Sequence, residues 1–244
     1  MSLPNVTSRE QWLVARRELL AREKQLTRQG DALNADRRRL PMVEIEKEYL
    51  FDGPAGPVAL ADLFAGRSQL IIQHIMFDPA WAAPCPGCSA ALDETSAGMI
   101  RHLESRDTSF AGVSRAPYAK LAAAKAERGW GLDWYSAYGS EFNYDFHATL
   151  DPSVAPVMYN YQTPEEAAAD PDPVTGSMEV PGFSCFLRDG QRIFHTYSTF
   201  ARGSDTLGSA YSFLDLTALG RSENWEEPKG RVAKPHGADP TFSD

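Results

Sequence analysis

The feature that most constrains the fold is an apolar run that leads directly into two closely spaced cysteines. The run SQLIIQHIMF (68–77) is rich in Ile, Leu, Met and Phe, which is typical of a strand buried on both faces of a sheet. The next segment, DPAWAAPCPGCSAALDE (78–94), places Cys85 and Cys88 three positions apart at the expected start of a helix. A predicted strand, a loop, a C-x-x-C motif and a predicted helix therefore follow one another without interruption.

Further predicted strands and helices alternate after the cysteines. Apolar residues at helical spacing follow Ser89, TSFAGVS (108–114) predicts a second buried strand, and Pro117 opens a segment of strong helix formers. GLDWYSAYG (131–139) predicts a third strand. The order strand, helix, strand, helix, strand predicts that the three strands pair in parallel within one α/β domain.

A hairpin and a helix are expected to complete the domain. Residues 183–198 alternate between apolar and polar side chains on both sides of Asp189-Gly190, a dipeptide typical of hairpin turns. Apolar residues at helical spacing between Leu207 and Ala218 predict the final helix.

Two terminal segments and one insertion are expected around this domain. We expect an N-terminal helical arm (1–41), a domain (42–220) with a Pro-rich surface insertion (151–182), and a C-terminal extension (221–244). Overlapping capping boxes at Thr7 and Ser8 predict where the arm begins. An apolar residue recurs every seven positions, at Trp12, Leu19, Leu26, Leu33 and Leu40. Such a seam is typical of a helix that packs on its own domain or on a second copy, which would make a homo-oligomer.

The composition restricts the expected partners and compartment. The 244 residues include 24 Lys and Arg against 33 Asp and Glu, a formal net charge of −9, which argues against binding to nucleic acid or to an anionic membrane. The N-terminus lacks an apolar signal core and no stretch resembles a membrane span, so a cytoplasmic location is expected. In a reducing compartment, a close cysteine pair is more typical of catalysis or metal binding than of a disulfide scaffold.

The spacing of Cys85 and Cys88 suits three roles. At a helix N-terminus, unpaired N–H groups and about half a positive charge stabilise a thiolate, and Cys88 can reach a mixed disulfide on Cys85. A structural zinc site would need further ligands with compact spacing, whereas the sequence offers Cys185 and scattered histidines. The third role is inert packing. No basic residue lies between Asp78 and Ala91, so the helix N-terminus is expected to supply most of the positive potential, with its amides directed at Cys85.

The element order, with C-x-x-C between the first buried strand and its helix, is the thioredoxin arrangement. The chain also resembles, over roughly residues 5–230, the bacterial thioredoxin-like proteins grouped as domain of unknown function 899. The resemblance rests on the N-terminal Trp-containing helix and on DGPAGPVALADLFAGRSQLIIQHIMF, CPGCS, SEFNYDF, FHTYSTFARG and LDLTALGR. It implies a thioredoxin-like fold with an N-terminal helical arm, and a dithiol–disulfide oxidoreductase whose paired thiols are Cys85 and Cys88. The middle of the chain is also similar to the alkyl hydroperoxide reductase and thiol-specific antioxidant branch.

Two features depart from ordinary thioredoxin. The dipeptide between the cysteines is Pro86-Gly87 instead of Gly-Pro, so a reducing potential does not follow from the resemblance. Thioredoxins also place a cis-proline just before the hairpin, facing the thiols. Pro181 is the candidate here, with Gly182 between it and the expected strand.

The expected activity is thiol–disulfide exchange. Cys85 would attack a disulfide of a protein or small molecule and Cys88 would resolve the mixed disulfide, with no cofactor and no metal. A thiol peroxidase is the first alternative, because Cys85 stands where peroxiredoxins have Thr, three residues before their reactive cysteine, which makes Cys88 the peroxide-attacking thiol. The second alternative is a non-catalytic module that binds a ligand or partner on a thioredoxin-like fold.

Several other residues are candidates for the site or for the core. The substrate-binding candidates are Trp81, Pro181, Trp134, Tyr138 and Arg202. The aromatic stretch 130–146 suits either a small core or a wall of a substrate groove. We expect it near the thiols, because parallel strands end at the same sheet edge. Cys185, His74 and His195 are expected to be packed or hydrogen-bonded residues rather than redox or acid–base groups.

Overall fold

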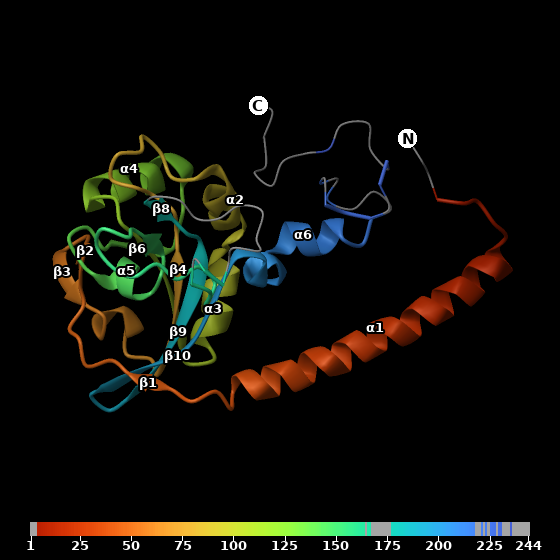
Figure 1. Cartoon of the computed structure of the whole chain (residues 1–244), viewed down its shortest axis with the longest axis horizontal. Helices are drawn as coiled ribbons and strands as arrows, with labels where there is room; N and C mark the ends of the chain where they lie inside the picture. The colour runs from red at the N-terminus through yellow and green to blue at the C-terminus, as the bar shows by residue number, and fades with distance from the viewer. Residues whose placement is uncertain are drawn as a thin grey trace. The chain divides into compact units, whose positions relative to one another are not determined.

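One sheet organises the part of the chain that carries the cysteines. Among the described residues, eight strands form this sheet in the order β1-β10-β9-β4-β5-β6-β2-β3 (Figure 1). They are β1 (Val43–Glu44), β2 (Leu50–Gly53), β3 (Gly56–Ala59), β4 (Gln69–His74), β5 (Thr108–Ser114), β6 (Asp133–Ser136), β9 (Gly182–Asp189) and β10 (Arg192–Phe200). β4, β5 and β6 pair in parallel, as predicted, whereas β9 runs antiparallel to β4 and β10. With the C-x-x-C motif after β4, the order β5-β4-β9-β10 is that of a thioredoxin-like fold.

The structure is a computed structural model that describes residues 4–163, 165–166, 177–217, 221, 223, 225–227, 229–230 and 235. These residues fall into two compact units. One unit contains residues 42–213 and the sheet, and the other contains the N-terminal residues up to 41 with the described residues from 214 onward.

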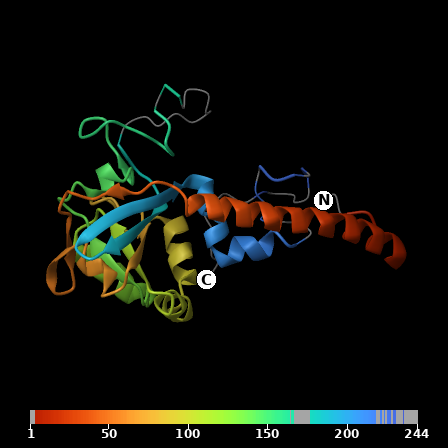
Figure 2. The same ribbon diagram turned by 90° about the horizontal axis from the view of Figure 1, so that it is seen from below.

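Short helices connect the strands of the sheet unit (Figures 1 and 2). They are the 3₁₀ helix η1 (Asp62–Phe64), α2 (Pro86–Glu94), α3 (Ala97–Glu104), α4 (Tyr118–Arg128) and α5 (Phe142–Asp145). The helical spacing that follows Ser89 is interrupted between α2 and α3. The hydroxyl of Ser96 accepts the N–H of Met99 at 3.1 Å and caps α3, so a new helix begins there.

The predicted hairpin is confirmed by β9 and β10, and Gly190 in its turn has φ +60°, which glycine adopts without strain. In the predicted insertion, β8 (Met178–Glu179) pairs with β7 (Thr149–Leu150), whereas residues 164 and 167–176 lie outside the described residues. The predicted final helix is shorter than expected. A 3₁₀ helix, η3 (Ala201–Leu207), is followed by α6 (Ser209–Leu214), and Ala218 lies outside the described residues.

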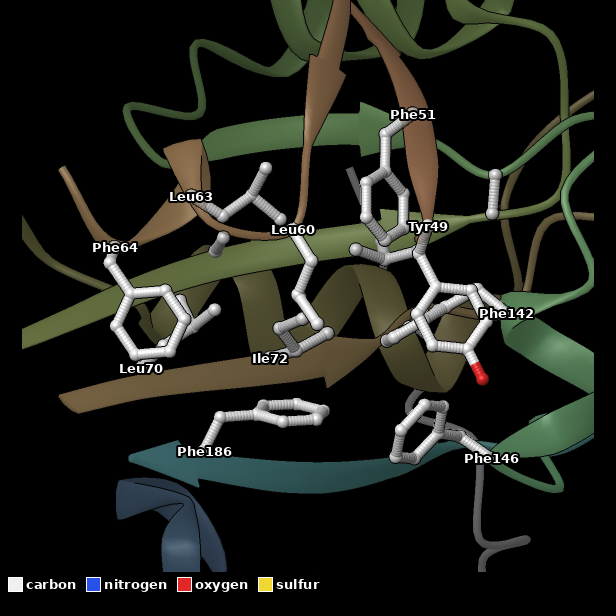
Figure 3. Packing of buried hydrophobic residues seen from close by; sticks show 13 residues of the cluster. Tyr49, Phe51, Leu60, Leu63, Phe64, Leu70, Ile72, Phe142, Phe146 and Phe186 are labelled. Carbon is white, nitrogen blue, oxygen red and sulfur yellow. The ribbon is translucent and has the colours of Figure 1, made fainter. Parts of the chain in front are cut away.

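Buried side chains form two main clusters in the sheet unit. In the first, the rings of Phe142, Phe146 and Phe186 gather beside Ile72 of β4, with centroids 5.2 Å apart for Phe146 and Phe186 (Figure 3). The second contains Cys88 and, at its margin, Cys85. Side chains of α2, α3 and α4 belong to this second cluster, so the cysteines lie against a packed core.

The helix α1 (Arg9–Arg37) confirms the predicted helical arm. Gln11 N–H donates to Ser8 Oγ at 3.3 Å and Ser8 N–H donates to Gln11 Oε1 at 3.5 Å, which is the predicted capping box. None of the residues Arg9–Arg37 is buried. Within the described part of the chain, no helix combines the length and the apolar character needed to cross a bilayer.

Candidate active site

The two cysteines belong to the first turn of α2. Cys85 is the N-cap residue and Pro86 follows it at the first helical position, where a proline ring matches the helical backbone and a missing N–H costs nothing. Cys85 is half-buried, whereas Cys88 is 6% exposed. An incoming molecule therefore meets Cys85 first.

The backbone of Met76 contacts both cysteines. Its carbonyl oxygen accepts the N–H of Cys85 at 3.0 Å, and its own N–H donates to Cys88 Sγ at 3.4 Å. Met76 lies two residues beyond β4, so the end of this strand fixes the start of α2. A backbone N–H is therefore directed at the sulfur of Cys88, whereas the sequence predicts helix amides directed at Cys85.

Two cations from the segment after β5 hold the loop between β4 and Cys85. The Lys120 ammonium donates to the carbonyl oxygens of Pro79 at 2.7 Å and Trp81 at 2.8 Å, and the Arg115 guanidinium pairs with Asp78. Positive charge at the loop therefore does not come from the helix N-terminus alone. Neither residue is predicted from the sequence as part of the site, although both follow a strand that is predicted to end beside β4.

Arg115 also binds a buried carboxylate just ahead of Pro181. Its Nε donates to Glu179 Oε1 at 2.7 Å, and the Thr149 hydroxyl donates to Glu179 Oε2 at 2.9 Å. The Glu179 side chain is 2% exposed. Burial raises the pKa of Glu179 above its ordinary value, while the hydrogen bonds from Arg115 and Thr149 act in the opposite direction.

Pro181 directly precedes β9, because the strand begins at Gly182. Gly182 is the register partner of His74 at the end of β4, so continuing the antiparallel register places Pro181 opposite Ile75, one residue before Met76. A side chain at Gly182 would come within 2.6 Å of the carbonyl oxygen of Thr199, which explains the glycine. The register thus predicts that Pro181 lies beside the segment that contacts the cysteines.

The aromatic stretch 130–146 divides between the two clusters. Trp130 and Trp134 belong to the cluster of Cys88, whereas Phe142 and Phe146 belong to the other. Trp130 Nε1 donates to Asp93 of α2 at 2.7 Å. The two tryptophans therefore pack in the same core cluster as side chains of α2, the helix that begins at the cysteines.

The remaining substrate-binding candidates lie on different elements. Trp81 is 39% exposed in the loop before Cys85, and Tyr138 is 56% exposed just beyond β6. Arg202 lies in η3, where its Nε is 3.2 Å from a carboxylate oxygen of Asp205. Trp81 and Tyr138 follow β4 and β6, and the carboxyl ends of these strands meet at the sheet edge that also carries Cys85.

The two histidines join a buried hydrogen-bond network. His74 Nε2 lies 2.7 Å from Ser184 Oγ, and His195 Nε2 lies 2.7 Å from Ser198 Oγ. Burial lowers the pKa of His74 to about 3 and also lowers the pKa of His195. Burial raises the pKa of Cys185 to about 11, so this thiol stays protonated and poorly reactive at neutral pH. Among the described residues, no three or more His, Cys, Asp or Glu side chains gather to hold a metal.

Similar solved structures have low identity to this chain. The PrxQ of Xylella fastidiosa, as a cysteine-to-serine mutant, is 12% identical with a TM-score of 0.43, covering 65% of this chain and 84% of that one. Peroxiredoxin Q of Xanthomonas campestris is 15% identical with a TM-score of 0.43, covering 65% and 87%. A putative protein disulfide isomerase of Bacteroides thetaiotaomicron is 15% identical with a TM-score of 0.37, covering 66% and 82%.

No curated protein matches the chain. A family match, in contrast, extends over residues 1–236 and so includes the helical arm, the cysteine pair and the hairpin. The chain therefore belongs to the family described as bacterial protein of unknown function (DUF899).

Proposed function

We propose that this chain is a thiol–disulfide oxidoreductase in which Cys85 is the nucleophile and Cys88 the resolving cysteine. The observation that carries the proposal is a C-x-x-C pair that begins α2 after a central strand, with Cys85 more exposed than Cys88. A half-buried thiol can meet a disulfide of a protein or small molecule. A buried thiol within the same helical turn suits an attack inside the molecule.

The exchange balances without a cofactor. The Cys85 thiolate attacks one sulfur of the substrate disulfide, and the other sulfur leaves as a thiolate and takes up a proton. Cys88 then loses its proton and attacks Cys85 Sγ, which releases the second substrate thiolate. The substrate gains two electrons and two protons, the protein keeps a Cys85–Cys88 disulfide, and an external dithiol must reduce it.

A thiol peroxidase is the second candidate, and the hydrogen bond from Met76 N–H to Cys88 Sγ favours it. In this reaction the Cys88 thiolate attacks the O–O bond, releases water or an alcohol, and becomes a sulfenic acid. The Cys85 thiol would then condense with the sulfenic acid and release water, again leaving a disulfide. Peroxides are small enough to reach a sulfur that a protein substrate cannot.

Single cysteine variants distinguish these reactions. Cys85→Ser should abolish reduction of a disulfide substrate, whereas Cys88→Ser should accumulate mixed disulfides through Cys85. Cys185→Ser is the matched control and should behave like the wild type, because partial burial keeps the Cys185 thiol protonated. Mass spectrometry after brief iodoacetamide treatment should find Cys85 labelled before Cys88 and Cys185.

Other results would reassign the function. Peroxide consumption that survives Cys85→Ser and disappears in Cys88→Ser would establish the peroxidase. If the wild type neither exchanges with any dithiol nor consumes peroxide, the site is a non-catalytic binding module, and the proposal is wrong.

A further inference from the structure

The loop before Cys85 is tied to the rest of the sheet edge by one guanidinium. Arg115 follows β5. Its Nη2 pairs with Asp78 of the loop, and its Nε pairs with Glu179, two residues before Pro181. Arg115 thus joins the segment that leads to the cysteines to the segment that leads into β9. Among the described residues, no other side chain forms ion pairs with carboxylates of both segments.

The anchor on the Glu179 side is rigid. The Glu179 carboxylate is almost completely buried and uses both oxygens, one for Arg115 and one for Thr149. Thr149 Oγ1 in turn accepts from Asn143 Nδ2 at 3.4 Å. A buried carboxylate held by two donors cannot move without losing hydrogen bonds that water does not replace, so Arg115 has a fixed position.

The ion pair of Arg115 with Asp78 holds a segment that contacts Cys88. Asp78 follows Phe77, which is buried in the same cluster as Cys88 and Ala116. Two residues before Asp78, the backbone N–H of Met76 donates to the Cys88 sulfur. Displacement of Asp78 would therefore loosen both the apolar cover and the hydrogen bond of the buried thiol.

From these contacts we infer that Arg115 is a positioning residue of the thiol site: by holding Asp78 against Glu179, it keeps the 76–78 segment closed over Cys88. The inference rests on the proposed function of the cysteine pair. It adds that Arg115 controls how accessible the Cys88 thiol is. It gives the loop a defined function, because a resolving thiol with restricted access leaves the first attack on a substrate disulfide to Cys85.

Asp78→Asn tests the inference with little other disturbance. Asp78 Oδ1 accepts the N–H of Ala80 at 2.7 Å, and an asparagine oxygen can keep this bond while an amide replaces the oxygen that faces Arg115. Arg115 keeps Glu179, so no buried charge loses its partner. We expect iodoacetamide to label Cys88 of the reduced protein at least about fivefold faster, relative to Cys185 of the same molecule.

The ratio of Cys88 to Cys185 labelling separates a local effect from general loosening. Loss of global stability would raise labelling of Cys88 and of the partly buried Cys185 together, so a higher ratio with unchanged Cys185 labelling marks a local effect. Glu44→Gln is the matched control, because it removes the carboxylate of an ion pair with Arg192 between β1 and β10, and its ratio should stay unchanged.

A second variant covers the case in which Asp78→Asn folds poorly. Arg115→Lys keeps a cation for Glu179, but a single ammonium cannot pair with both carboxylates as the planar guanidinium does. It should therefore also raise the ratio of Cys88 to Cys185 labelling. A ratio within about twofold of the wild type in both variants would overturn the inference. Because the reduced protein is labelled without turnover, this outcome is distinct from a wild type that fails to reduce any disulfide.

Discussion

At the scale of single residues, His74 has an unusual environment for a titratable group. Its Nε2 is hydrogen-bonded to Ser184, and Ser184 Oγ lies 2.7 Å from Ser198 Oγ, so the network continues to His195 on β10. Its Nδ1 is buried and has no hydrogen-bond partner among the residues that the structure describes. Protonation would bury a charge without a counterion, which is why the neutral form is strongly favoured.

This environment predicts a loss of stability in mild acid. The pKa of His74 falls from 6.5 to about 3 on folding, so the unfolded chain takes up a proton in this window and the folded chain does not. As the pH falls below 6.5, the free energy of unfolding should drop by up to about 1.4 kcal/mol per pH unit. His195 and His147, whose pKa values burial also lowers, act in the same direction.

Urea unfolding at about pH 7 and about pH 5 measures the effect, which should reach roughly 2 kcal/mol for the wild type. His74→Gln should lose less stability between these conditions, because the group that titrates is gone. His102→Gln, on the exposed side of α3, should keep the wild-type dependence. An identical pH dependence for His74→Gln and the wild type would contradict this account.

At the scale of elements, the candidate site is assembled from chain segments that lie at the ends of neighbouring strands. β4 leads to the cysteines, β5 leads to Arg115 and Lys120, and the segment before β9 brings Glu179 and Pro181. β4 and β5 run parallel, and β9 runs antiparallel to β4. The carboxyl ends of β4 and β5 therefore meet the amino end of β9 at one edge of the sheet. Each segment alone is unremarkable, and the sheet order creates the site.

The packing of the third predicted strand gives a spectroscopic prediction. Trp130 and Trp134 share a cluster with Cys88, and Trp130 is hydrogen-bonded to α2, so closure of a Cys85–Cys88 disulfide should alter tryptophan emission. Fluorescence spectra of oxidised and reduced wild type should differ, and Trp134→Phe should reduce the difference. Trp12→Phe in α1 is the control and should preserve it. Identical spectra for the two redox states of the wild type would count against the placement of the tryptophans beside the thiols.

The sequence predicted those elements whose signal is local. The strand expected at residues 108–114 is β5, and the helix expected after Pro117 is α4, because apolar runs and helix formers act within a few residues. The break between α2 and α3 was missed because Ser96 fits a helical spacing and a cap equally well.

The candidate site was predicted only in part, for a related reason. Cys85 and Cys88 are recognisable from their own spacing, and Pro181 from its place before the hairpin. Arg115 and Lys120 contact the loop across 37 to 41 positions of the chain, and Glu179 reaches Arg115 across 64. Such contacts follow from strand order and side-chain direction, which no local pattern encodes.

At the scale of the whole molecule, the helix α1 presents an apolar seam. Its members Trp12, Leu19, Leu26 and Leu33 are 47%, 46%, 69% and 52% exposed. Leu40, which continues the spacing, lies beyond the helix end at Arg37. Burying a leucine stabilises a protein by about 1.5–3 kcal/mol. If all four seam residues stayed in water, the folded state would lack several kcal/mol of stabilisation that their burial could supply. We therefore expect the seam to be covered, by a second copy of the chain or by another part of the same chain.

Comparing the full-length chain with a variant that lacks residues 1–36 tests this expectation. The truncated chain should have a lower mass in light scattering, if α1 pairs two copies, or a lower melting temperature by roughly 2–4 °C per kcal/mol lost, if α1 packs within one chain. The double variant Leu19→Gln/Leu26→Gln should reproduce the effect, because it makes the seam polar without shortening the helix. Arg17→Gln/Lys24→Gln changes two exposed positions outside the seam and should have no effect. If deletion leaves both mass and melting temperature unchanged, the seam has no partner and the prediction fails.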